Sequence, residues 1–152
     1  MRIAVCSDEP YPVHQVLIGD LKERGYEVVT FGSVKTNTDE SWVKVAREAA
    51  EAVASGACDE GIFCCWTGTG ISMAANKVPG IRAALCGDSE TASGARIWNH
   101  ANVLALSNRL LNPENVLEIL GAWFSPDNDG APGVEGVREL SALEKVYRKP
   151  PS

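Results

Sequence analysis

The amino-acid sequence predicts an α/β fold, a single domain built on a doubly wound, five-stranded parallel sheet. Short apolar runs alternate along the chain with longer segments of helical periodicity. Strands separated in this way by helices pair in parallel, and the helices cover both faces of the sheet. Turn-forming residues separate the runs, which supports the same division into elements.

The expected strands are RIAVC, YEVVTFG, GIFCC, IRAALC and NVLALS, at residues 2–6, 26–32, 61–65, 81–86 and 102–107. The expected helices lie between and after them, at residues 12–24, 39–56, 70–80, 88–98 and 113–124. Gly25 and Gly56 suit helix C-termini, whereas Asp88 and Pro113 suit helix N-termini. Together these elements predict a Rossmann-like or flavodoxin-like three-layer sandwich.

The C-terminal part of the chain adds one more helix to this domain. Residues 125–133, SPDNDGAPG, form a turn-rich connection to an expected helix at residues 134–148. Little of the domain is left for this helix to contact, so it packs either on a neighbouring subunit or back on its own domain. We favour the neighbouring subunit and expect a homodimer or a dimer of dimers, with residues 1–152 forming one domain.

Composition excludes several classes of function. The net charge of −6, without a run of Lys or Arg, argues against nucleic acid and anionic membranes as partners. No apolar run approaches the roughly 20 residues of a membrane span, and the N-terminus does not resemble a signal peptide. The odd number of cysteines, 5, indicates reduced thiols in the cytoplasm. Their spacing does not suit zinc, and we expect neither a metal nor another cofactor.

Ligands of parallel sheets bind beyond the carboxyl ends of the strands, which here means just after Cys6, Cys65, Cys86 and Leu106. The stretch IFCCWTGTGISMAANK, residues 62–77, places a thiol before hydroxyls and glycines at a helix start. It is not a dinucleotide fingerprint, because Met73 occupies the third glycine position, and it lacks the lysine of a P-loop. It also lacks the arginine that a cysteine-dependent phosphatase needs.

What remains at this loop is a thiol facing backbone N–H groups at a helix N-terminus. Such donors stabilise negative charge on a ligand and raise the thiolate fraction of a cysteine. The thiolate of Cys65 could attack a carbonyl, or remove a proton next to one. The alternative is that Cys65 packs as a small hydrophobic residue, which is how we interpret Cys6, Cys58 and Cys86. Cys64 points to the opposite face of the strand.

The segment CWTGTGISMAANKVPGIRAAL, residues 65–85, resembles the signature of the ribose-5-phosphate isomerase B and galactose-6-phosphate isomerase family. The resemblance extends over nearly the whole chain, including RIAVCSDE, ERGYEVVTFG and NHANVLALSNRL. It implies an isomerase that interconverts aldose and ketose phosphates through an enediolate. In the branch that this loop resembles, a cysteine moves the proton between C1 and C2, and this role falls on Cys65.

The resemblance also implies roles for the residues around this cysteine. Thr67 would assist proton transfer between the substrate oxygens or ring opening, and backbone N–H groups near Gly68 and Gly70 would hold the enediolate. The other branch has a glutamate base where this chain has Ile71. Further substrate contacts are expected from Asp8, Thr69, Asn76, Asn99 and Arg109, of which Asp8 binds sugar hydroxyls and Arg109 the phosphate.

Several positions depart from the family pattern. Glu9 replaces a histidine that helps to hold phosphate, and a carboxylate repels a phosphate dianion. Trp98 stands where the ring-opening histidine is expected, so His100 becomes the candidate for that role. Arg138 is the one arginine near the position of a missing pair. Trp66 replaces a small residue, and its ring would crowd or stack on the ligand.

Three functions therefore stay open. The first is an isomerase of a sugar phosphate held by Arg109, Lys77 or Arg138, and this is the one we favour. The second is an isomerase of an unphosphorylated sugar that Glu9 and Trp66 bind by hydrogen bonds and stacking. The third is a non-catalytic sugar-binding chain or partner subunit, although such a chain has no need of the Cys65 thiol.

Overall fold

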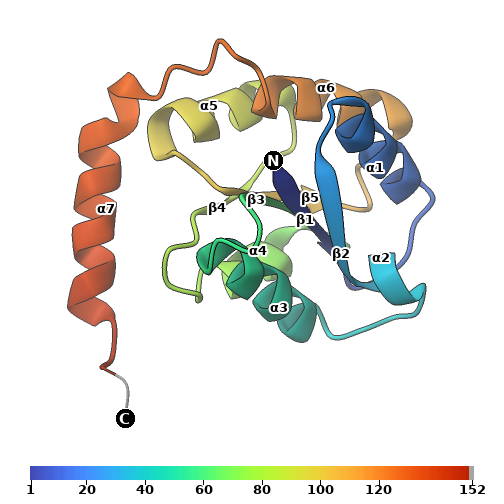
Figure 1. The fold of residues 1–152 in the computed structure, drawn as a ribbon, viewed down its shortest axis with the longest axis horizontal. Helices are drawn as coiled ribbons and strands as arrows, with labels where there is room; N and C mark the ends of the chain where they lie inside the picture. The colour runs from blue at the N-terminus through green and yellow to red at the C-terminus, as the bar shows by residue number, and fades with distance from the viewer. Residues whose placement is uncertain (151–152) are drawn as a thin grey trace.

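The computed structural model describes residues 1–150 and contains one five-stranded sheet (Figure 1). Its strand order is β2-β1-β3-β5-β4, and all four pairings are parallel. The strands are β1 (Arg2–Ser7), β2 (Glu27–Gly32), β3 (Glu60–Cys65), β4 (Ala83–Leu85) and β5 (Val103–Ser107). The doubly wound parallel sheet predicted from the sequence is confirmed.

Helices cover both faces of this sheet (Figure 1). They are α1 (Val13–Glu23), α2 (Ser33–Thr36), α3 (Trp42–Ala54), α4 (Thr69–Ala75), α5 (Ser89–Asn99), α6 (Pro113–Trp123) and α7 (Val134–Tyr147), with a 3₁₀ turn at Ala131–Gly133. One core lies under α1, α5 and α6, and a second lies under α3 and α4. Adjacent strand residues alternate between the cores, as Ile3 and Ala4 do.

The element boundaries differ in detail from the predicted ones. The short helix α2 was not predicted, and α3 starts at Trp42 because the Ser41 hydroxyl accepts a hydrogen bond from the Lys44 N–H at 3.3 Å. Strand β4 is only three residues long. Among residues 1–150, no helix combines the length and apolar character that crossing a membrane requires.

Helix α7 stands apart from the rest of the domain (Figure 1). None of its residues is buried, and its exposed apolar side chains are those of Val134, Leu140, Leu143, Val146 and Tyr147. A groove of about 920 Å³ separates α7 from α5 and from the edge strand β4. Exposed apolar surface of this extent is typical of a binding face rather than of a solvated helix.

The loop after β2 depends on a glycine. Gly32 has a φ of +63°, which side-chain-bearing residues rarely adopt. A Cβ atom on Gly32 would also lie 2.6 Å from the Ser7 carbonyl oxygen. Glycine therefore allows β2 to turn sharply into α2 against the end of β1.

We expect Gly32→Ala to lower the free energy of unfolding by about 3 kcal/mol, because strain from positive φ costs about 1–2 kcal/mol and the steric clash adds to it. Gly25→Ala is the matched control, since Gly25 also has positive φ (+82°) but has open space around it. Urea unfolding followed by circular dichroism measures both variants. Equal losses in the two would contradict the role given to close packing at Gly32.

Candidate active site

The loops after β1, β3 and β5 meet at the carboxyl edge of the sheet. Ser7 is paired with Cys64, and Cys65 with Ser107, so the three strands end side by side. Residues 7–9, 65–67 and 107–109 are therefore neighbours in space although they are far apart in the sequence. From β1 the chain continues to β2 on one side, and from β2 it continues to β3 on the other side of β1. In parallel sheets the ligand crevice lies at such a switch point, beyond the carboxyl ends of the strands.

Cys65 is the last residue of β3 and lies at this crevice. Its side chain is on the α3–α4 face and is 5% exposed, whereas Cys64 points to the other face and is fully buried. The Cys65 carbonyl accepts a hydrogen bond from the Asn108 backbone N–H at 2.8 Å. Burial raises the pKa of the Cys64 thiol, so that thiol stays protonated at neutral pH. Of the two adjacent thiols, Cys65 is the one that can serve a ligand in the crevice.

The loop after Cys65 supplies hydrogen-bond donors. Gly68 precedes α4 with a φ of +76°, and a Cβ atom there would lie 2.9 Å from the Leu106 backbone carbon. The hydroxyls of Thr67 and Thr69 are 2.7 Å apart, and both residues are exposed. The first backbone N–H groups of α4 have no partner within the helix. This loop thus presents hydroxyls and N–H groups beside the Cys65 thiol.

Trp42, the first residue of α3, covers the same loop. A Cβ atom on Gly70 would lie 3.1 Å from the Trp42 ring, so the glycine allows the ring to approach the backbone. Trp42 remains 43% exposed. Trp42 is not among the site residues predicted from the sequence, although an aromatic residue at the exposed start of a helix is a signal for such a site.

The opposite side of the crevice is acidic. The Asp8 carboxylate is buried, and its Oδ1 atom has no hydrogen-bond partner among the described residues. Burial and the neighbouring Glu9 charge raise the pKa of Asp8. A buried carboxylate oxygen without a partner is unfavourable, and a ligand hydroxyl group would satisfy it.

Tyr11 links Glu9 to Trp66. The Tyr11 hydroxyl donates a hydrogen bond of 2.6 Å to the Glu9 carboxylate, which raises the pKa of Tyr11 to about 12. The rings of Tyr11 and Trp66 stack, with centroids 6.0 Å apart and an interplanar angle of 28°. Trp66 is 51% exposed, so one side of its ring is open to a ligand.

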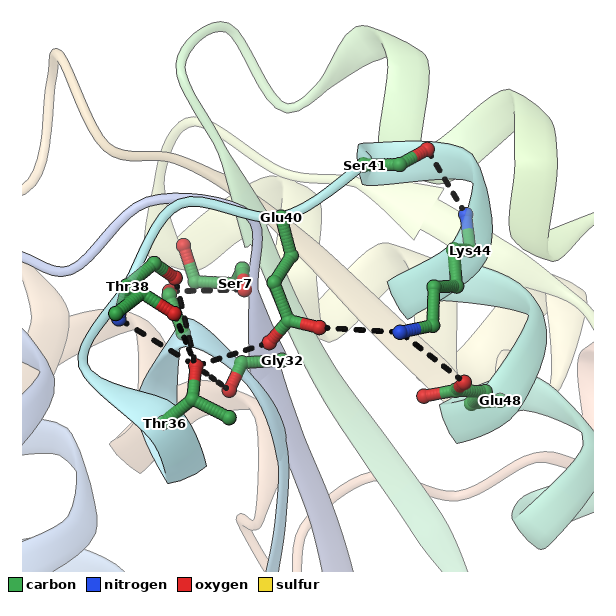
Figure 2. A network of polar contacts seen from close by, with 9 residues as sticks. Ser7, Gly32, Thr36, Thr38, Glu40, Ser41, Lys44 and Glu48 are labelled. Carbon is green, nitrogen blue, oxygen red and sulfur yellow. Dashed lines mark hydrogen bonds and ion pairs between the residues drawn. The ribbon is translucent and has the colours of Figure 1, made fainter.

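The loop between α2 and α3 contacts the Asp8 backbone. Polar contacts hold this loop in place (Figure 2). The Thr36 hydroxyl bonds the Gly32 carbonyl at 3.2 Å and the Glu40 carboxylate at 3.0 Å. Glu40 also pairs with Lys44 at 3.3 Å (Figure 2). These contacts fix the Glu40 backbone N–H, which donates to the Asp8 carbonyl at 2.8 Å. The network thereby positions the backbone of the acidic side of the crevice.

Other predicted site residues lie elsewhere in the single chain. The Asn76 amide bonds the backbone N–H and carbonyl of Ala83 at 2.8 and 2.9 Å. Trp98 and Asn99 line the groove beside α7, together with Asn76. Arg138, on α7, pairs with Glu135 at 2.9 Å.

His100 and Arg109 differ in where they lie relative to Cys65. The His100 ring bonds the Gly130 carbonyl at 2.7 Å and lies near Glu60, at the start of β3. His100 and Cys65 are thus at opposite edges of the sheet, and one chain does not bring them together. Arg109 follows β5 at the carboxyl edge, where its backbone N–H donates to the Trp66 carbonyl at 3.1 Å.

We expect Asp8→Asn to raise the free energy of unfolding at pH 7 by about 1 kcal/mol, because it removes a charge whose burial is unfavourable. A raised pKa means that the folded state binds the Asp8 proton more tightly than the unfolded chain does. The gain should therefore shrink as the pH falls towards the unfolded value of 3.8. Urea unfolding at pH 7 and near pH 4 measures it. A destabilised Asp8→Asn protein at pH 7 would contradict this account.

Comparisons with known proteins agree with the geometry of the chain. A family model described as Ribose/Galactose Isomerase matches residues 3–140. The chain is 38% identical over 128 residues to D-erythrulose-4-phosphate isomerase from Pectobacterium atrosepticum, covering 82% of this chain and 84% of that protein. It is 34% identical over 140 residues to ribose-5-phosphate isomerase B from Escherichia coli, covering 92% and 93%.

The fold has a solved counterpart as well. The structure of ribose-5-phosphate isomerase B from Clostridium thermocellum superposes with a TM-score of 0.87 and 40% sequence identity, covering 97% of this chain and 100% of that one. The chain belongs to the ribose/galactose isomerase family, which confirms the resemblance seen in its sequence.

Proposed function

We propose that this protein is an aldose–ketose isomerase that acts on a sugar phosphate, with Cys65 as the general base. The observation that carries the proposal is the position of Cys65 between two complementary sides of one crevice. The Thr67–Thr69 side offers hydroxyls and N–H groups, and the Asp8 side offers a carboxylate oxygen without a partner. Relatives of this family that are named as sugar-phosphate isomerases support the same reaction.

The proposed reaction moves two protons and leaves the oxidation level of the whole substrate unchanged. The Cys65 thiolate removes the proton from C2 of the aldose, and the C2–H electron pair forms the enediolate double bond. Donors near Gly68 and Gly70 stabilise the negative charge on the oxygens. Thr67 transfers the hydroxyl proton from O2 to O1. The Cys65 thiol then returns its proton to C1, which yields the ketose without a cofactor.

Phosphate recognition rests on few cations in this chain. Arg109 lies in the loop after β5, at the same edge of the sheet as Cys65, and it is exposed. Lys77 and Arg138 are the other candidates, and both are exposed as well. Glu9 places a carboxylate on the acidic side of the crevice, where it would repel a phosphate group. An unphosphorylated sugar is therefore the second candidate substrate. The hydrogen bond between Tyr11 and Glu9 favours this alternative, since it holds the carboxylate in place.

We also propose that the enzyme is a homodimer, alone or within a dimer of dimers, and that it works in the cytoplasm. The groove beside α7 is lined by Leu140, Leu143 and the exposed Trp98, and a second copy would cover these side chains. A second copy could also bring its His100 and Arg138 towards the Cys65 crevice, which lacks them in one chain. The free state of all five cysteines supports a reducing compartment.

We expect Cys65→Ala to lower kcat at least 1,000-fold, because removing a general base and its thiolate leaves no group to take the proton. Erythrulose 4-phosphate, ribose 5-phosphate and the two unphosphorylated sugars form the substrate panel, tested in heavy water. NMR should find deuterium next to the carbonyl with the unmodified protein and none with Cys65→Ala.

Cys64→Ala is the control for this experiment, since Cys64 is a fully buried thiol on the other side of the strand. It should keep most of the activity and lose some stability. Undiminished deuterium incorporation by Cys65→Ala would refute the assignment of the base. Turnover of the free sugars alone would establish the second candidate substrate.

The dimer is tested by two substitutions on α7. We expect Leu143→Asp to halve the particle mass measured by light scattering, because it places a charge in the apolar groove. Activity should fall with the mass if the partner completes the site. Val146→Asp is the control, since Val146 is 74% exposed and does not line the groove. An active, unmodified protein that is monomeric at micromolar concentration would contradict the proposal.

A further inference from the structure

His14 is a buried titratable residue that the proposed reaction does not use. It lies in the first turn of α1 and is 3% exposed. The ring accepts the Tyr11 backbone N–H through Nδ1 at 3.4 Å, so Nε2 carries the proton and donates to the Asn108 Oδ1 atom at 2.8 Å. Burial lowers the pKa of His14, which favours this neutral form.

Asn108 connects His14 to two loops of the site. Its side-chain N–H donates to the Ser7 hydroxyl at 3.1 Å, and that hydroxyl donates to the Glu9 carbonyl at 2.7 Å. Its backbone N–H donates to the Cys65 carbonyl at 2.8 Å. Asn108 is itself 6% exposed, so water does not replace these bonds easily. One residue, through its side chain and its backbone, thus joins the ends of β1, β3 and β5.

His14 also contacts the aromatic wall, which we define as Glu9, Tyr11 and Trp66. The Tyr11 ring stands edge-on to the imidazole, with centroids 6.0 Å apart and an interplanar angle of 89°. Tyr11 in turn stacks on Trp66 and bonds Glu9. The imidazole therefore contacts Tyr11, which holds the other residues of the wall in place. Through Asn108 it is also connected to the end of β3 that carries Cys65.

We propose that His14 is a positioning residue that sets the place of the aromatic wall relative to Cys65. This inference rests on the proposed function of Cys65. A ligand that stacks on Trp66 reaches the thiol correctly only if the two surfaces keep a fixed separation. A shift of the wall weakens the stacking that binds the ligand, whereas a displacement of Cys65 by about 1 Å can lower the rate up to about 100-fold. His14 itself lies behind the wall and does not contact the ligand.

The two hydrogen bonds of His14 can be removed separately. His14→Gln places an amide N–H near Nε2, so it keeps the Asn108 bond and loses the Tyr11 bond. His14→Asn places an amide oxygen near Nδ1, so it keeps the Tyr11 bond and loses the Asn108 bond. His14→Leu removes both and keeps apolar volume. Gln15→Ala, at the exposed next position of α1, is the control.

We use the name half-variants for His14→Gln and His14→Asn, each of which removes one of the two hydrogen bonds. We expect them to separate the effect on substrate binding from the effect on the chemical step. His14→Gln should raise KM for the best substrate of the panel about tenfold at nearly constant kcat, because the wall shifts while Cys65 stays in place. His14→Asn should lower kcat about tenfold at nearly constant KM. His14→Leu should show both effects, and Gln15→Ala neither. Half-variants that change KM and kcat alike, or that lose only thermal stability, would overturn the proposal.

A second readout does not depend on the activity of Cys65. The indole N–H resonance of Trp66, assigned with Trp66→Phe, should shift in His14→Gln and stay in place in His14→Asn. If Cys65→Ala remains active while this pattern holds, the proposed base is wrong and the positioning of the wall stands. An indole resonance that is unchanged in both half-variants would contradict the proposal even if Cys65 proves essential.

Discussion

The parallel register of β1, β3 and β5 is the constraint on which the site depends. It brings the ends of three strands that are far apart in the sequence to one edge of the sheet. The Asn108 N–H then bonds the Cys65 carbonyl and fixes the strand end from which the thiol projects. A shift of one residue in β3 would exchange Cys65 for Cys64 and turn the Cys65 thiol into the opposite core.

Charge is divided between the two sides of the crevice. The loop after Cys65 offers donors, which suit the oxygens of an enediolate, whereas Asp8 and Glu9 offer acceptors, which suit sugar hydroxyls. This division makes the orientation of the ligand depend on its polarity rather than on shape alone. The same acidic side disfavours a phosphate group near Glu9, so any phosphate must lie towards a cation of this chain or of a second copy.

The sequence predicted the strands, the long helices and the place of Cys65, because apolar runs and the glycine-rich loop are local signals. It did not predict α2, since four residues carry too little periodicity. It also missed His14 and Asn108, whose contact joins residues 94 positions apart and exists only in the folded chain. His100 was also predicted to share a site with Cys65, and within one chain the two residues lie at opposite ends of β3.

If the Cys65 thiolate carries the proton, alkylation of the individual cysteines should reveal it. The protein is treated with iodoacetamide near neutral pH, and mass spectrometry follows each of the five thiols while activity is measured. We expect Cys65 to be alkylated first, activity to fall in step with its modification, and substrate to slow both. Full activity in protein alkylated at Cys65 would contradict it.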